Sequence, residues 1–257
     1  MPRRDWTRDE LLLAMNLYCQ LPFGRLHKSN PDVIRLAGVI GRTPSSAAMK
    51  LVNLASLDPV HQERGVKGLS GASKGDRQIW GEFHDDWERL SAESEALREQ
   101  RFAAVAGDSS APPDDVDLPF AGETDATAVV RVRRAQRFFR RAVLTAYEAR
   151  CCVTDIGLPD LLVASHIVPW SSSVEHRANP RNGLCLSQLH DAAFDRGLVT
   201  FDPEWRLVLS RELRDATTNE TLNASFVPFE GRPLRLPERF RPESEFVSRH
   251  RQEMFRG

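Results

Sequence analysis

Apolar positions in the first 60 residues recur at the spacing of amphipathic helices. The segment TRDELLLAMNLYCQL predicts a helix with Thr7 as its N-cap, and Glu10 three residues later completes a capping box. A second helix is predicted in PDVIRLAGVIG, where Gly41 ends it. A third is predicted in RTPSSAAMKLVNLASLD, with Thr43 as its N-cap and proline at the first helical position. The pattern therefore predicts a mainly helical amino-terminal domain.

The order of these helices is typical of a DNA-binding unit. Two helices, a short turn and a third capped helix form a helix-turn-helix, and the opening DWTRDEL resembles that of Myb-like DNA-binding domains. This interpretation exposes polar residues of the third helix toward DNA, namely Arg42, Ser45, Ser46, Lys50 and Asn53. The alternative is a plain helical bundle whose third helix shows a solvated face.

A second helical pattern, VVRVRRAQRFFRRAVLTAYEARC, combines apolar residues with arginines. Seven arginines lie between Arg131 and Arg150, accompanied by a single glutamate. An amphipathic helix with an arginine face is predicted. A run of charged residues ordinarily forms a solvated helix face. Seven arginines against one glutamate exceed what solubility requires, so this excess of positive charge favours contact with phosphate. The candidates for phosphate or base contacts are Arg131, Arg134, Gln136 and Arg140.

A polar segment separates the two patterns. Residues 106–128, AGDSSAPPDDVDLPFAGETDATA, are rich in Pro, Gly, Ser and Asp and predict a linker between a domain at 1–105 and another at 129–257. The net charge of −1 conceals a basic second half, since residues 127–257 carry 20 Lys and Arg against 16 Asp and Glu. This excess is compatible with a phosphate-bearing partner, although it is a weak signal alone.

Composition excludes several classes of protein. No apolar run approaches the roughly 20 residues that span a bilayer, and the amino terminus MPRRDWTRDE has no apolar core of an export signal. The four cysteines form no CxxC pair, which argues against a disulfide framework and an all-cysteine zinc site. We therefore expect a cytoplasmic protein with core thiols, no structural zinc and no membrane partner.

The chemistry-bearing pattern follows the arginine-rich helix. CCVTDIGLPDLLVASHIVPW contains β-prone runs and predicts a strand or hairpin ending at His166. A polar loop containing Asn182 leads to a second short strand, GLCLSQ, and LHDAAFDRG predicts a short helix that carries His190 and ends at Gly197. Strand, loop, strand and helix in this order form a ββα-metal arrangement. With the helical first domain, the expected fold class is α+β.

The run SHIVPW…NPRNGLCLSQLHDAAFDRGLVTFD closely resembles the HNH endonucleases, in the branch typified by restriction enzymes, and the resemblance extends over roughly residues 130–257. It implies that His166 is the general base, that Asn182 tethers the loop and that His190 helps to hold a metal ion. Phosphodiester hydrolysis needs an activated water, a cation and positioning, and a neutral imidazole suits the role of base. The expected ion is Mg²⁺, with Mn²⁺ or another divalent ion as alternatives. The implied substrate is double-stranded DNA.

The sequence departs from the family at one position. Many HNH enzymes carry an aspartate metal ligand directly before the first histidine, where this chain has Ser165, whose neutral hydroxyl is a poor ligand. Asp195 or Asp191 is a candidate replacement. Asp195 lies five residues after His190, about 140° around a helix axis, so shared coordination requires the helix to end or distort between them. The expected metal set is His190, Asp195 and the Ser165 position.

The resemblance favours a restriction-type defence enzyme, with a requirement for base modification left open. Two alternatives remain: a DNA-binding regulator whose nuclease motif is impaired, which Ser165 keeps open, and an HNH nuclease acting on RNA or structured DNA. Cleavage of both strands by one active site per chain favours a homodimer.

Overall fold

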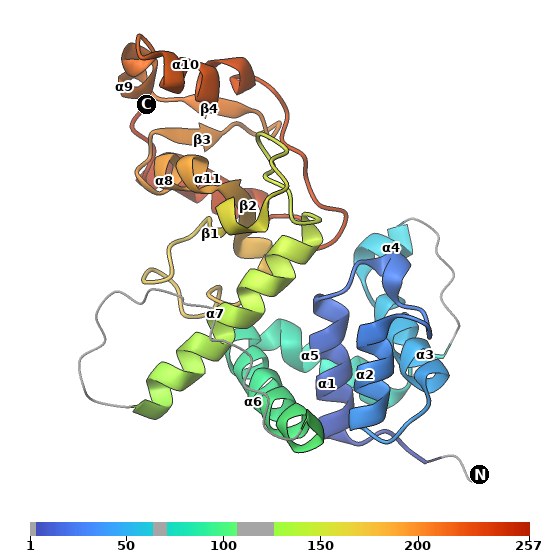
Figure 1. Cartoon of the computed structure of the whole chain (residues 1–257). Coiled ribbons are helices and arrows are strands. Elements are labelled where there is room, and N and C mark those ends of the chain that lie inside the picture. Colours follow the sequence, from blue (N-terminus) through green and yellow to red (C-terminus); the bar gives the residue numbers. More distant parts are fainter. Residues whose placement is uncertain (1–3, 64–70, 107–125) are drawn as a thin grey trace. The chain divides into compact units, whose positions relative to one another are not determined.

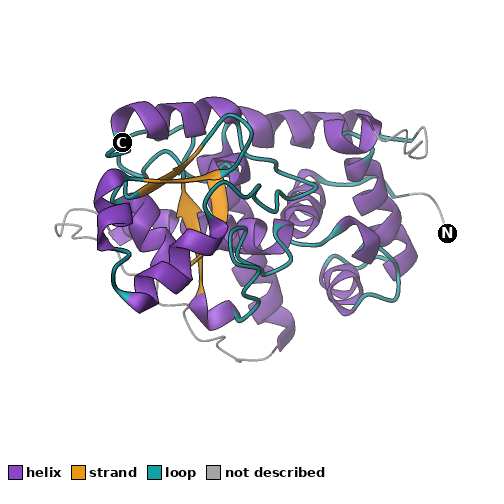
Figure 2. Cartoon of the chain, turned by 90° about the horizontal axis from the view of Figure 1, so that it is seen from above, coloured by secondary structure: helices purple, strands orange, loops and turns teal. Residues whose placement is uncertain are grey.

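The computed structural model describes residues 4–63, 71–106 and 126–257 (Figure 1). Contacts group the chain into two compact units, Met1–Ala142 and Val143–Gly257. Within the described residues, strands occur only in the second unit (Figure 2). The expected α+β class is therefore confirmed. The predicted linker at 106–128 lies almost entirely outside the described residues, and the division between the units falls within a helix that follows it.

The described part of the first unit is built from helices. They are α1 (Arg8–Cys19), the 3-10 turn η1 (Phe23–Arg25), α2 (Pro31–Val39), α3 (Pro44–Ala55), α4 (Pro59–Glu63), α5 (Lys74–Asp85), α6 (Trp87–Ala106) and most of α7 (Ala126–Ala146). The predicted capping box is present, because Thr7 and Glu10 each accept a hydrogen bond from the other's backbone N–H. Thr43 caps α3, and Gly41 has a φ of +62°, as the end of a helix requires. These local predictions are confirmed.

The core of this unit lies between α1 and its neighbours. Helix α1 packs against α3, α5 and α6, while α2 packs against α3. Leu12, Met15 and Tyr18 of α1 are fully buried, and the Tyr18 hydroxyl donates to Asp58 at 2.9 Å. Burial of such large side chains is the main favourable contribution to folding of a helical unit of this size. None of the helices in the described ranges is long and apolar enough to cross a membrane.

The exposure expected for Arg42 and Lys50 is wrong. Lys50 retains only 5% of its surface, and its Nζ lies 2.6 Å from a carboxylate oxygen of the fully buried Asp76. Arg42 lies 2.7 Å from the Glu10 carboxylate, and its side chain retains 9% of its surface. The physical reason is that Glu10 and Asp76 are capping-box acids held in the interior, and a buried carboxylate requires a cation. Asn53 is half-buried and donates through its side chain to the Gly71 carbonyl at 3.3 Å.

Part of the arginine face of α7 pairs with acids of α6. Glu99 accepts from Arg134 at 2.7 Å and from Arg137 at 2.8 Å, so these guanidinium groups have partners inside the unit. Arg134 is therefore already paired in this structure. Arg131 is exposed, whereas Gln136 and Arg140 are half-buried.

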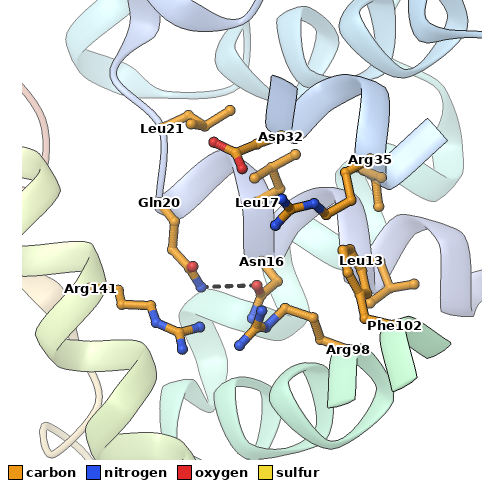
Figure 3. Close-up of a pocket in the computed structure, with 11 residues that line it drawn as sticks. Leu13, Asn16, Leu17, Gln20, Leu21, Asp32, Arg35, Arg98, Phe102 and Arg141 are labelled. Carbon is orange, nitrogen blue, oxygen red and sulfur yellow. Dashed lines mark hydrogen bonds between the residues drawn. The ribbon is translucent and has the colours of Figure 1, made fainter. Parts of the chain in front are cut away.

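A second acid of α6, Glu95, is fully buried and organises a pocket of about 240 Å³ (Figure 3). Its carboxylate accepts hydrogen bonds from Asn16 at 2.9 Å, Gln20 at 3.1 Å, Arg98 at 3.1 Å and Arg141 at 3.3 Å. These four donors line the pocket, and Gln20 also donates to Asn16. Four donors on one carboxylate offset the desolvation of its charge, which explains why polar side chains gather there.

The second unit contains two small antiparallel sheets. Strand β1 (Leu162–His166) pairs with β2 (Gly183–Ser187), and β3 (Val199–Phe201) pairs with β4 (Leu207–Leu209). The other elements are α8 (Gln188–Asp195), α9 (Arg211–Ala216), α10 (Glu220–Phe226), α11 (Ser244–Glu253) and the 3-10 turns η2 (Pro159–Leu161), η3 (Pro180–Asn182) and η4 (Val227–Phe229). Helix α8 packs on β1, β2 and β3. The predicted strand ending at His166, the second strand and the short helix are confirmed.

Several residues of the second unit to which the sequence assigned no chemical role lie in its core. Cys151, Cys152 and Cys185 are buried free thiols, as expected for core positions. His250 of α11 bonds Thr200 through Nδ1 at 3.0 Å and the Phe194 carbonyl through Nε2 at 3.0 Å. Its ring also stacks on the Phe194 ring at 3.8 Å. His250 therefore joins α11 to β3 and α8.

Candidate active site

His166 is the last residue of β1, opposite Gly183 of β2. Its Nε2 lies 2.8 Å from the carbonyl oxygen of Arg177. A carbonyl oxygen can only accept, so this contact places the ring proton on Nε2 and makes Nδ1 the acceptor nitrogen of the neutral ring. Burial lowers the pKa of His166 to about 4, against a smaller opposite effect of the Arg177 carbonyl. The imidazole is therefore neutral at neutral pH, as a general base must be.

Asn182 connects the two limbs of the loop that follows β1. Its Oδ1 accepts from the Val168 N–H at 2.8 Å, and its Nδ2 donates to the carbonyls of Val168 at 3.0 Å and His176 at 3.2 Å. The Asn182 carbonyl also accepts from the Ile167 N–H at 3.0 Å. The side chain is buried, with 1% of its surface exposed. It holds the main chain next to His166, and a catalytic contribution beyond this stays a prediction.

Replacement of Asn182 with alanine is expected to destabilise the second unit by about 2–4 kcal/mol, because three buried hydrogen bonds are lost and two carbonyls and an N–H remain unpaired. Asn182→Asp is the matched control for shape: it keeps the acceptor for Val168 but loses both donors. Thermal unfolding should rank wild type above both variants. An alanine variant as stable as wild type would show that the loop does not depend on this amide.

His190, the expected metal ligand of α8, lies among aromatic side chains, and its role as a ligand stays a prediction. Its Nδ1 lies 2.9 Å from the Ser187 hydroxyl, and its ring packs on Phe226 and Phe229 with centroids 4.8 and 6.1 Å away. Its Nε2 is buried and makes no hydrogen bond to a described residue. Burial lowers the pKa of His190 to about 4, against an opposite effect of the Ser225 backbone. The histidine is neutral and lies in an aromatic core.

The helix carrying His190 does not end or distort as shared coordination with Asp195 would require. Helix α8 is continuous from Gln188 to Asp195, so the two side chains leave it at different angles. Over the described part of the chain, no group of three or more His, Cys, Asp or Glu is arranged to hold a metal ion. The expected set of His190, Asp195 and the Ser165 position includes only two residues of these types, so it stays a prediction.

The structure instead pairs Asp195 with Asp191, one turn earlier on the same face of α8. Desolvation, and secondly the charge of Asp191, raise the pKa of Asp195 to about 6, although Asp195 is an exposed residue by its surface area. Desolvation also raises the pKa of Asp191, and the Ser165 hydroxyl opposes that shift. Ser165 Oγ is buried and near enough to Asp191 to lower the pKa of that carboxyl, but no described residue meets hydrogen-bond geometry with it. Two mutually repelling carboxylates beside an unsatisfied hydroxyl suit a cation.

The sequence indicated Asp191 only as an alternative ligand, and it gave no sign of a role for Arg177. The signal for Asp191 was present, because two aspartates spaced four apart in a helix lie on one face. The contribution of Arg177 comes from its main-chain carbonyl. Any residue type has that group, so no sequence pattern indicates it.

An antiparallel strand pair covered by a helix, with a histidine at the end of the first strand, is the arrangement of a ββα-metal nuclease. Residues 151–202 match the family model described as HNH endonuclease, a range that includes β1, β2, α8 and β3. The chain therefore carries an HNH endonuclease domain, and nucleases of this family generally use a divalent metal ion. No curated protein matches the chain.

Proposed function

We propose that this protein is a metal-dependent endonuclease that hydrolyses phosphodiester bonds of double-stranded DNA. The observation that carries the proposal is the neutral His166 imidazole, held by the Arg177 carbonyl at the end of β1 within the HNH match. A restriction-type defence role in the cytoplasm, with the protein acting as a homodimer, is part of the same proposal and rests on the resemblance of its sequence to that branch.

In the proposed reaction, His166 Nδ1 accepts a proton from the attacking water. The resulting imidazolium keeps its Nε2–H on the Arg177 carbonyl, and this charge-assisted contact stabilises the positive ring. Asn182 holds Val168 and the loop in place during this transfer. Exposed cations such as Arg131 are candidates to bind DNA phosphates.

The side chains of Asp191, Asp195 and Ser165 fit a divalent cation. Asp191 and Asp195 would hold the ion with the Ser165 hydroxyl nearby, and the raised pKa values of both carboxyls reflect an unfavourable negative charge that a cation would relieve. Mg²⁺ binds through one or two carboxylates and keeps several waters, so it suits this small ligand set better than an ion that needs many protein ligands. The bound ion would supply positive charge to the scissile phosphate.

The proposed activity is tested by incubating wild-type protein with supercoiled plasmid and either Mg²⁺, Mn²⁺ or EDTA, using DNA with and without base modifications. Cleavage with a divalent ion and none with EDTA is expected. Parallel single-stranded RNA and branched DNA substrates test the alternative nuclease specificity. Binding of DNA without cleavage under every condition would contradict the enzyme proposal and favour the regulator.

Asp191→Asn is expected to raise the melting temperature in EDTA and to abolish the further increase that Mg²⁺ gives wild type. The amide removes the repulsion with Asp195, but it also removes a ligand. An ion at 100 times its Kd stabilises by about 2.7 kcal/mol, which thermal unfolding detects readily. Asp160→Asn, at an exposed position, is the control and should respond to Mg²⁺ as wild type does. A response of Asp191→Asn equal to that of wild type would place the ion elsewhere.

A further inference from the structure

The loop after β1 brings two side chains, Trp170 and Arg177, against His166. The Trp170 ring meets the imidazole edge to face, with centroids 5.5 Å apart and planes at 85°. The Arg177 guanidinium lies over the Trp170 ring at 5.3 Å from its centroid, and Arg177 Nε donates to the Trp170 carbonyl at 2.7 Å. Both the side chain and the main chain of Trp170 therefore contact Arg177.

The main chain of Arg177 completes a closed set of contacts. Its carbonyl accepts the Nε2–H of His166 at 2.8 Å, so Arg177 binds Trp170 through its side chain and His166 through its backbone. The position of this carbonyl is therefore linked to the guanidinium contact with Trp170. We call Trp170 and Arg177 together the loop clamp.

We propose that the loop clamp positions the general base: the guanidinium of Arg177, held on Trp170, keeps the Arg177 carbonyl at the His166 Nε2–H. Trp170 and Arg177 are positioning residues, since they act through His166. This inference rests on the proposed nuclease function for its catalytic consequence. The structural part, an imidazole held by the clamp, is independent of that function.

The clamp is distinct from the support that Asn182 provides. The Asn182 amide bonds the main chain of Val168 and of His176, so it supports the loop at groups other than the Arg177 carbonyl. Loss of the Arg177 side chain should therefore leave the path of the loop unchanged. The expected change is greater mobility of the Arg177 carbonyl relative to the His166 Nε2–H. Displacement of a catalytic group by about 1 Å can lower the reaction rate by about 100-fold. A small shift of the Arg177 carbonyl, and with it of His166, should therefore be measurable.

The chemistry of the contact requires arginine. The planar guanidinium stacks on an aromatic face and donates in its own plane at the same time, whereas the lysine ammonium is a point charge on a flexible stem. Arg177→Lys therefore keeps the charge but removes the stacked, in-plane geometry. Trp170→Phe keeps an aromatic ring, whereas Trp170→Ala removes it. Together with Arg177→Ala, these variants separate charge from geometry.

The direct test is solvent exchange of the His166 Nε2–H proton, measured by NMR and assigned by its absence in His166→Ala. Wild type and Trp170→Phe should show a protected proton, whereas Arg177→Ala, Arg177→Lys and Trp170→Ala should exchange at least about 10-fold faster. Retention of wild-type protection in Arg177→Ala and Trp170→Ala would overturn the proposal. This readout requires no nuclease activity, so failure of the clamp and failure of the proposed function give different results.

Kinetics provide the second readout. With a cleavable DNA, Arg177→Ala and Arg177→Lys should lower kcat by about 10- to 100-fold with little change in KM, because positioning affects the chemical step more than substrate binding. A rise in KM with unchanged kcat would instead assign Arg177 to DNA binding and contradict the positioning role. Melting temperatures identify a variant that fails to fold. In that event, Arg177→Lys and Trp170→Phe, which change the contact least, decide between the two outcomes.

Discussion

Replacement of His166 with alanine is expected to lower the rate of DNA cleavage by about 100- to 10,000-fold, the usual contribution of a general base. The ring is neutral at neutral pH because burial lowers its pKa, and the Arg177 carbonyl holds the proton on Nε2. Alanine has no group that can accept a proton from water. Because Ile167 keeps its backbone bond to Asn182 in the variant, the strand end should stay in place.

The measurement is single-turnover cleavage of a plasmid with Mg²⁺ or Mn²⁺, combined with the melting temperature of each protein. His27→Ala is the matched control, since His27 is an exposed histidine of the first unit whose Nδ1 lies 2.9 Å from the Ser29 hydroxyl. It should cleave at the wild-type rate. If His166→Ala cleaved as fast as this control, the base would be another group, and the assignment of His166 would be wrong.

Local chemistry explains which elements are predictable from the sequence. Thr7 with Glu10, Thr43 before proline, and glycine at 41 and 197 act through hydrogen bonds or dihedral angles within a few residues. The strand ending at His166 follows from the same kind of local pattern. The predicted exposure of Arg42 and Lys50 was wrong because each pairs with a carboxylate that lies far away in the sequence. Lys50 resembles a surface lysine until Asp76 is placed beside it, 26 residues away.

The candidate site shows the same limit. The order His166, Asn182, His190 indicates the family correctly, but the family pattern alone does not tell which side chains of α8 face β1. The structure turns His190 into the aromatic core with Phe226 and directs Asp191 toward Ser165. A serine in place of the usual aspartate thus faces a carboxylate supplied by the helix. In the proposed metal site, Asp191 of α8 would supply the carboxylate that Ser165 lacks.

Gly197→Ala is expected to destabilise the second unit by about 2–5 kcal/mol. Gly197 has a φ of +67°, where a side chain costs about 1–2 kcal/mol. A Cβ there would also lie 1.9 Å from the carbonyl oxygen of Met254, and overpacking of this kind costs about 1–3 kcal/mol. The backbone cannot simply withdraw, because the Gly197 carbonyl accepts from the Arg256 N–H at 2.9 Å.

Gly231→Ala separates the two causes. Gly231 has a φ of +70°, but a Cβ added there would meet no heavy atom within 4 Å, so its variant carries the dihedral cost alone. Thermal unfolding should show a clearly larger loss for Gly197→Ala, and equal losses would mean that the Met254 carbonyl moves away freely. The difference bears on the site as well as on stability. Gly197 follows Asp195 by two residues, so displacement of the C-terminal segment from the end of α8 should also weaken Mg²⁺ binding, whereas Gly231→Ala should leave it unchanged.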